Sequence, residues 1–144
     1  MQVSEMMNTN IISVAPEDTV TVAARLLERH NIGALPVCSD DGRLRGIVTD
    51  RDIVLRCVAA ESDPETTKVR EIMTRGVSCV APDDDAREAA RLMSAEQIRR
   101  LPVVRENRVV GMLSLCDLAR SQSYDMEASK ALTEISMPKK KYKH

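Results

Sequence analysis

The chain has 144 residues, of which 43% are hydrophobic and 30% charged, and its formal net charge is −1. This length suits one compact domain or two very small ones, and the near-zero charge gives no indication of a nucleic-acid or membrane partner. No stretch approaches the roughly 20 apolar residues of a membrane span. Residues 1–5 lack the basic and apolar regions of a signal peptide, so we expect a cytoplasmic protein.

The sequence contains one unit twice. Residues 3–37 align with residues 69–103, and the motif that begins at Gly46 returns at Gly111. We expect repeat 1 over residues 1–61, a linker over 62–68, repeat 2 over 69–122 and a tail over 123–144. The element order in each copy, β-α-β-β-α, predicts an α/β (α+β) fold in which the two repeats pack with pseudo-two-fold symmetry.

The first two elements of each copy are a short strand and an amphipathic helix. Residues 11–14 and 77–80 are short apolar runs that end at Ala-Pro, where proline stops ladder pairing. Apolar residues then recur at the i, i+3, i+4 and i+7 spacing of a helix, and they are Val20, Ala23, Ala24 and Leu27 in the first copy and Ala86, Ala89, Ala90 and Met93 in the second. Asp85 and Glu88 have capping-box spacing, with Asp85 as the cap.

A hairpin and a second helix complete each copy. Residues 35–38 and 44–48 predict two strands around a Gly-containing turn, which the second copy shortens to residues 105–107. Helices are expected from 50 to about 58 and from 115 to about 122. In the tail, residues 126–135 predict a short helix and residues 138–144 a frayed basic end.

The chain has no Phe and no Trp, so the core must be aliphatic, with Met filling gaps. Single-strand nucleic-acid binders usually stack bases on aromatic side chains, so this composition disfavours them. Four cysteines form no CxxC pair, and only two histidines could join them as zinc ligands. We expect reduced and mostly buried thiols and no metal site.

The repeated motif combines a hydroxyl residue with an acid three positions later. Thr49-x-x-Asp52 and Ser114-x-x-Asp117 fit capping boxes, and this structural role needs no ligand. The functional interpretation uses the same geometry, because a helix start attracts phosphate and a carboxylate can accept hydrogen bonds from ribose hydroxyls. Gly46 and Gly111 would allow a close backbone approach. Arginine can bind phosphate with two hydrogen bonds, and Arg51, Arg99 and Arg100 lie in or near the motifs.

With both motifs in view, the chain resembles a tandem pair of cystathionine-β-synthase (CBS) domains, a Bateman module, over about residues 3–122. The pattern Gly-h-x-(Ser/Thr)-x-x-Asp-h, where h is apolar, occurs twice. Each copy follows an Ile-x-x-Leu-Pro-Val element, at residues 32–37 and 98–103.

The resemblance implies that AMP, ADP or ATP binds in clefts between the repeats, with S-adenosylmethionine ranked below them and no required cofactor. It implies that Asp52 and Asp117 bind the ribose hydroxyls and that Thr49 and Ser114 contact ribose or phosphate. Ile11 and Val77 would line the adenine pockets. The complete set of expected nucleotide-binding residues is Ile11, Gly33, Ala34, Thr49, Asp50, Arg51, Asp52, Val77, Arg99, Arg100, Ser114 and Asp117. The first copy is closer to the family's ligand-binding form, so the Thr49–Asp52 cleft is the expected occupied site.

The leading hypothesis is therefore a stand-alone regulatory sensor that acts as a homodimer through the helices of its CBS pair and signals to an unknown protein partner. The alternative is a structural or interaction module with vestigial clefts. An enzyme ranks third, because the sequence has no Walker A, HExxH or GxSxG motif. Nucleic-acid binding through the lysines of residues 139–143 is not expected.

Overall fold

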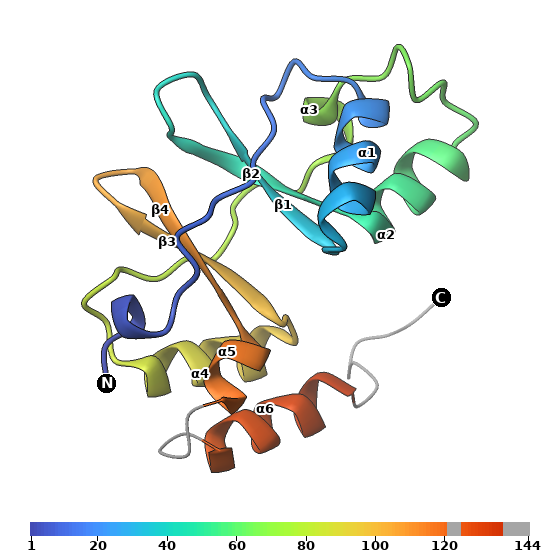
Figure 1. The fold of residues 1–144 in the computed structure, drawn as a ribbon. Helices are drawn as coiled ribbons and strands as arrows, with labels where there is room; N and C mark the ends of the chain where they lie inside the picture. Colours follow the sequence, from blue (N-terminus) through green and yellow to red (C-terminus); the bar gives the residue numbers. More distant parts are fainter. Residues whose placement is uncertain (121–124, 137–144) are drawn as a thin grey trace. The chain divides into compact units, whose positions relative to one another are not determined.

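The structure is a computed structural model that describes residues 1–120 and 125–136, with side chains for residues 1–120 and 130–136. Two compact units make up the chain (Figure 1). The first-repeat unit contains Asn10–Ser78 and Glu106–Val109. The second-repeat unit contains Met1–Thr9, Cys79–Arg105 and Val110–His144.

The first-repeat unit is a two-stranded antiparallel sheet with helices. Its elements are α1 (Val20–His30), β1 (Ala34–Cys38), β2 (Leu44–Thr49), α2 (Asp50–Ile53), the π-helix η2 (Val54–Val58) and α3 (Val69–Ile72). The apolar spacing predicted α1, and the structure confirms it, with Thr19 as its N-cap. The second helix covers the predicted residues 50–58, but its second half has π geometry.

The second-repeat unit repeats this order. Its elements are η1 (Val3–Glu5), α4 (Ala86–Glu96), β3 (Arg100–Arg105), β4 (Arg108–Ser114), α5 (Leu115–Ala119) and α6 (Asp125–Ser136). The predicted helices at α4 and in the tail are confirmed. Asp85 caps α4 by accepting the Arg87 N–H at 2.9 Å, whereas Glu88 pairs with Arg91 instead of completing a box. The predicted frayed end lies outside the described residues.

The strands expected at residues 11–14 and 77–80 are wrong, because each forms only a single parallel bridge. Val14 donates to the Pro36 carbonyl at 3.1 Å and accepts from the Cys38 N–H at 2.8 Å. Val80 makes the same two bonds with Pro102 and Val104, at 3.1 and 2.8 Å. The prolines of β1 and β3 lack the N–H that the preceding bridge would need, so the ladder cannot extend toward residues 12 and 78.

Each unit has its own aliphatic core. The fully buried side chains include Leu35, Val48 and Ile72 in the first-repeat unit, and Met93 and Leu113 in the second. The prediction of an aliphatic core with buried methionine is therefore confirmed. The prediction for the cysteines is partly wrong, because all four are free thiols but Cys79 and Cys116 are exposed, Cys38 is half-buried and only Cys57 is buried.

The segment that opens each sequence repeat packs in the unit formed mainly by the other repeat. Val3 donates to the Asp84 carbonyl at 2.9 Å, and Asn8 pairs with Met112 in the second-repeat unit. Val69 likewise donates to the Asp18 carbonyl at 2.8 Å in the first-repeat unit. The compact units are thus assembled from non-contiguous pieces, while the sequence boundaries at 61 and 69 stay a prediction.

Candidate functional site

The first motif forms a complete capping box at the start of α2. Thr49 has extended backbone geometry, with φ −119° and ψ 165°. Its hydroxyl accepts the Asp52 N–H at 3.1 Å, and the Asp52 Oδ2 accepts the Thr49 N–H at 2.9 Å. Two N–H groups that a helix start leaves unpaired are therefore satisfied by the motif itself.

The second motif forms the same box at the start of α5. The Ser114 hydroxyl accepts the Asp117 N–H at 3.1 Å, and the Asp117 Oδ2 accepts the Ser114 N–H at 2.8 Å. Both acid side chains are 12% exposed. The structural role that the motif predicts is therefore realised in both copies, with one carboxylate oxygen of each acid engaged in the box.

The start of the preceding strand lies against each box. Ala34 is the β1 partner of Thr49, and the Gly33 carbonyl accepts the Asp50 N–H at 3.1 Å. In the other unit, the Arg99 carbonyl accepts the Leu115 N–H at 2.8 Å. The structure therefore brings the expected contact element of each copy to the box of the same copy.

Each motif glycine lies tightly against another segment of the chain. A Cβ on Gly46 would lie 2.6 Å from the Thr74 carbonyl oxygen, because residue 74 pairs with Ile47 across this position. A Cβ on Gly111 would lie 2.7 Å from the Met7 Sδ and 3.1 Å from the Asn8 oxygen. The close approach expected at these glycines is thus made by the segments that open the two repeats, residues 7–8 and 73–74, and it needs no ligand.

Two arginines beside the acids were missed by sequence reasoning. The Arg56 Nε lies 3.9 Å from the Asp52 Oδ1, and its Nη1 donates to the carbonyls of Ile72 and Met73 at 3.0 and 3.3 Å. The Arg120 Nη1 donates to the Asp117 Oδ1 at 3.1 Å. The spacing of four residues in the first case and three in the second is a signal for a helical ion pair that the sequence already contained.

The remaining expected contact residues are spread over both units. Arg51 is exposed and belongs to the first-repeat unit. Arg99 and Arg100 are exposed and belong to the second-repeat unit, which also contains the half-buried Ser114 and Asp117. Val77 is half-buried, and it belongs to the first-repeat unit.

Ile11 lines a cavity of about 330 Å³ beside the β1–β2 turn, together with Ser13, Cys38, Asp40 and other residues of that turn. Burial raises the pKa of the Cys38 thiol, against a smaller opposing effect of the hydrogen bond with Ser13. A thiol with a raised pKa is a weak nucleophile and a poor metal ligand at neutral pH. Within the described ranges 1–120 and 125–136, no three His, Cys, Asp or Glu side chains are grouped to hold a metal ion.

The same capping box occurs in both units, as expected for a tandem repeat, and comparison with known proteins gives the family. The CBS domain model matches residues 3–58 and 69–124. The chain belongs to the CBS domain family, and it carries two copies of the domain. Among the parts of the chain that are described, no helix has the length and apolar character needed to cross a membrane.

Several relatives match nearly the whole chain. The CBS domain-containing protein YhcV of Bacillus subtilis is 42% identical over 134 residues, which cover 93% of this chain and 94% of that protein. The crystal structure of Hypoxic Response Protein I with two coordinated zinc ions has a TM-score of 0.78 and 38% identity, covering 83% of this chain and 98% of that one. The CBS domain pair of protein MJ0100, in complex with 5′-methylthioadenosine and S-adenosyl-L-methionine, has a TM-score of 0.75 and 31% identity, covering 83% and 94%.

Proposed function

We propose that this protein is a stand-alone regulatory module that binds an adenosine nucleotide, AMP, ADP or ATP, with the box of Thr49 and Asp52 as its principal site. Binding changes the relative populations of conformations through differential affinity, and a protein partner reads the result. The module acts as a homodimer through its CBS-pair helices.

The proposal rests mainly on the second carboxylate oxygen of Asp52, which has no hydrogen bond to the protein. The Oδ2 atom is engaged in the box, while the Oδ1 atom lies 3.9 Å from the Arg56 Nε, beyond hydrogen-bond distance. A carboxylate with a free oxygen at a partly exposed helix start can accept hydrogen bonds from the vicinal hydroxyls of ribose. The MJ0100 relative, whose two ligands both contain adenosine, supports this ligand class.

The basic residues of the motif supply the expected phosphate contacts. Arg51 directly precedes Asp52, and its side chain is exposed. In the second copy, Arg99 and Arg100 lie beside the Ser114 box, where the first copy has Gly33 and Ala34. Since guanidinium groups bind phosphate with paired hydrogen bonds, we expect nucleotides with more phosphates to gain affinity from these three residues.

A thermal-shift series with AMP, ADP, ATP and S-adenosylmethionine tests the proposal. A ligand present at 100 times its Kd stabilises the folded chain by about 2.7 kcal/mol. The 2′-deoxy form of the best nucleotide should bind less tightly, because it lacks one hydroxyl of the ribose pair. A folded chain that none of these compounds stabilises would contradict the proposal.

Asp52→Asn and Asp117→Asn form a matched pair of variants. Hydrogen bonds to charged groups contribute about 1.5–3 kcal/mol, so Asp52→Asn should weaken nucleotide binding by roughly 10- to 100-fold, while Asp117→Asn should change it little. Isothermal titration calorimetry measures both. The 2′-deoxy penalty should also shrink in Asp52→Asn, which distinguishes loss of a ribose contact from a general loss of folding.

The structural alternative has its own supporting observation, because both boxes are complete and both acids have protein partners without a ligand. Under this alternative, Asp52→Ala and Asp117→Ala lower the stability and leave no binding defect to measure. Equal destabilisation of both variants, with no adenosyl ligand bound by the wild-type chain, would favour an interaction module with vestigial sites.

A further inference from the structure

One side chain of the first-repeat unit lies between the acid of the first capping box and the end of α3. Arg56 lies on η2, and its Nη1 donates to the carbonyls of Ile72 and Met73 at 3.0 and 3.3 Å. Its Nε lies 3.9 Å from the Asp52 Oδ1. Ile72 is the last residue of α3 and Met73 is its C-cap, so Arg56 binds two carbonyls that the helix itself leaves without a partner.

The segment that carries these carbonyls is attached to the strand that leads into the box. The Met73 N–H donates to the Val69 carbonyl at 2.9 Å, and the Thr74 N–H donates to the Ile47 carbonyl at 2.8 Å. Ile47 lies on β2, two residues before Thr49. The exchange of the two amide hydrogens therefore reports how firmly the end of α3 is held.

The second copy shows a different position for an arginine beside the same acid. Arg120 donates directly to the Asp117 Oδ1 at 3.1 Å. In the repeat alignment, Ser121 stands at the position of Arg56, so the second copy has no arginine at that position. An arginine three or four residues after the acid can reach its carboxylate, and Arg56 therefore has two competing sets of acceptors, the carboxylate and the carbonyls.

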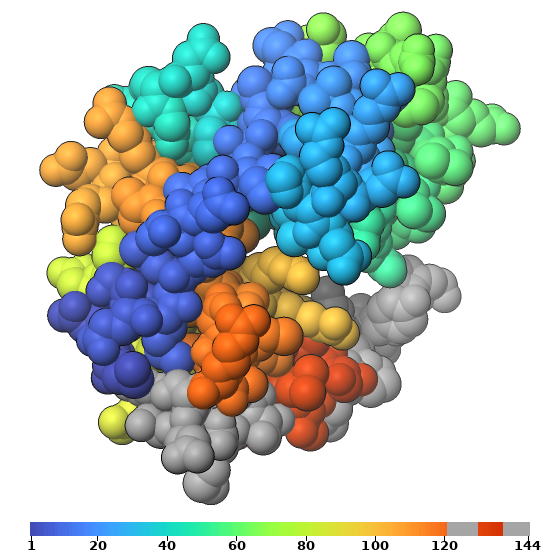
Figure 2. Space-filling model, viewed as in Figure 1, coloured from blue at the N-terminus to red at the C-terminus, as the bar shows by residue number. Residues whose placement is uncertain are grey.

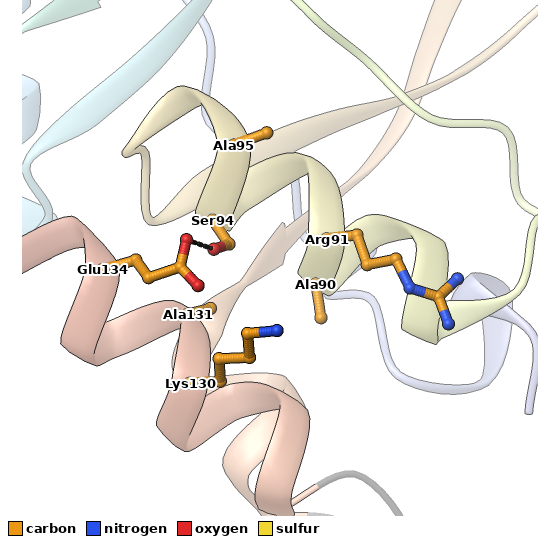
Figure 3. A pocket seen from close by; sticks show the side chains of 7 residues that line it. All are labelled: Ala90, Arg91, Ser94, Ala95, Lys130, Ala131 and Glu134. Carbon is orange, nitrogen blue, oxygen red and sulfur yellow. Dashed lines mark hydrogen bonds between the residues drawn. The ribbon is translucent and has the colours of Figure 1, made fainter.

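The helices that follow the two boxes also differ in their surroundings. In the second-repeat unit, α6 packs on α4 and α5. Figure 3 shows the hydrogen bond of 2.5 Å from the Ser94 hydroxyl to Glu134, beside the cavity of about 550 Å³ that α4 and α6 line. In Figure 2 the segment after α2 (blue-green) lies at the surface, and the Arg56 side chain is 51% exposed. Neighbouring side chains therefore leave Arg56 free to change its partner.

We propose that Arg56 is a positioning residue that couples nucleotide binding at Asp52 to the end of α3. The inference rests on the proposed function and adds a regulatory response to the same site. A guanidinium bonds more strongly to a carboxylate than to neutral carbonyls, so a free Asp52 Oδ1 draws Arg56 away from Ile72 and Met73. Ribose hydroxyls that donate to this oxygen compete with the guanidinium, and Arg56 then stays on the carbonyls. Because coupling is reciprocal, a bound nucleotide stabilises the end of α3, and a firmly held α3 favours the nucleotide.

Hydrogen exchange at Met73 and Thr74 tests the coupling in the full chain. AMP, ADP or ATP, whichever stabilises the wild type most, should slow these amides at least about fivefold more than the amides of α1, since coupling between two sites typically starts near that factor. The α1 amides measure the general stabilisation by the ligand. Arg56→Ala should abolish the excess, and Arg56→Lys should restore part of it. Arg70→Ala is the matched control, because it removes an arginine of α3 that pairs with Glu17, and it should keep the excess.

The same two amides also give a test without ligand. Asp52→Asn removes the charge that attracts Arg56 and keeps an oxygen for the Thr49 N–H, so exchange at Met73 and Thr74 should become slower. A substitution that only weakened the box would make it faster, and the sign therefore separates the two roles. In the background of Arg56→Ala, Asp52→Asn should no longer slow these amides.

The outcomes distinguish this coupling from nucleotide binding itself. Faster exchange in ligand-free Asp52→Asn, an excess that survives in Arg56→Ala, or no excess in a wild-type chain that binds nucleotide would overturn the inference and leave the proposed ligand in place. Slower exchange in ligand-free Asp52→Asn that requires Arg56, in a chain that binds none of the three nucleotides, would support the link through Arg56 and overturn the proposed ligand.

Discussion

Thr49 and Asp52 form the same hydrogen-bonded box as Ser114 and Asp117, but the arginine beside each acid is held differently. Arg56 is bonded to the carbonyls of Ile72 and Met73, and its Nε stays 3.9 Å from Asp52. Arg120 donates directly to Asp117 at 3.1 Å. A repeated motif therefore specifies the local turn, while residues outside the motif decide whether the second carboxylate oxygen has a hydrogen-bond partner in the protein.

The largest expected difference between the units comes from their glycines. Gly46→Ala would place a Cβ 2.6 Å from the Thr74 carbonyl, where paired backbone has to move. We expect destabilisation of about 1–3 kcal/mol. Gly111→Ala would meet chiefly the Met7 Sδ, a flexible side chain that can rotate away, so its cost should be smaller. Urea unfolding of the two variants measures the difference, and an equal loss of stability in both would contradict this expectation.

The hydroxyl caps should show how alike the boxes are. Thr49→Ala and Ser114→Ala each remove one acceptor from a 3.1 Å hydrogen bond, so each should cost about 1 kcal/mol. Thr49→Ser and Ser114→Thr keep the hydroxyl, and they serve as controls that should retain most of the stability. Thermal unfolding provides the measurement, and a clear inequality between the two alanine variants would show that the surroundings already alter the cap.

Arg56 should contribute more to stability than Arg120, whereas Arg120 should do more to keep a ligand from the acid beside it. Arg56→Ala removes two bonds to backbone carbonyls as well as the ion pair, so we expect a loss of about 1 kcal/mol. Arg120→Ala breaks an exposed pair worth about 0.2–1 kcal/mol, and it frees the Asp117 Oδ1. Calorimetry with the best nucleotide should therefore detect a stronger second site in Arg120→Ala. A binding stoichiometry and affinity identical to wild type would contradict this view of Asp117.

The smallest expected effect is a response to acid that both units share. The Ser39 hydroxyl lowers the pKa of Asp41, and the Arg87 N–H lowers the pKa of Asp85. A lowered pKa means that the folded state favours the ionised form, so this stability is complete above the ordinary carboxyl pKa of about 4 and is lost as the pH falls through the lowered value. Unfolding midpoints below pH 4 should depend less steeply on pH in Asp41→Asn and Asp85→Asn than in wild type.

Much of the fold was predictable because the signals were local. The spacing from Val20 to Leu27 predicted α1, and the Gly-containing turn at residues 39–42 predicted the β1–β2 hairpin; both elements were found. The strands at residues 11–14 and 77–80 were wrong, because their pairing depends on prolines in a neighbouring strand that sequence periodicity does not reveal. The segment that opens each repeat packs in the unit formed mainly by the other repeat. This packing depends on contacts far apart in the sequence, and no local pattern indicates it.

The candidate site was predicted in part for the same reason. Both capping boxes follow from residues three apart and were found as expected. The reason for Gly46 was not visible, because its neighbour Thr74 lies far along the chain. Arg56 was also missed. Its spacing from Asp52 is a signal for a helical ion pair, but its hydrogen bonds to the backbone carbonyls of residues 72 and 73 have no side-chain signature.

The pairing of Asn8 with Met112 has a consequence for biosynthesis. During translation residues 1–9 are made about 100 residues before their native partner at Met112. Contacts this distant in sequence form slowly, because a long loop must close before they are gained. Residues 10–78 contain nearly all of the first-repeat unit, so we expect that unit to form on the ribosome. Residues 1–9 should become ordered later, when the second-repeat unit has been synthesised.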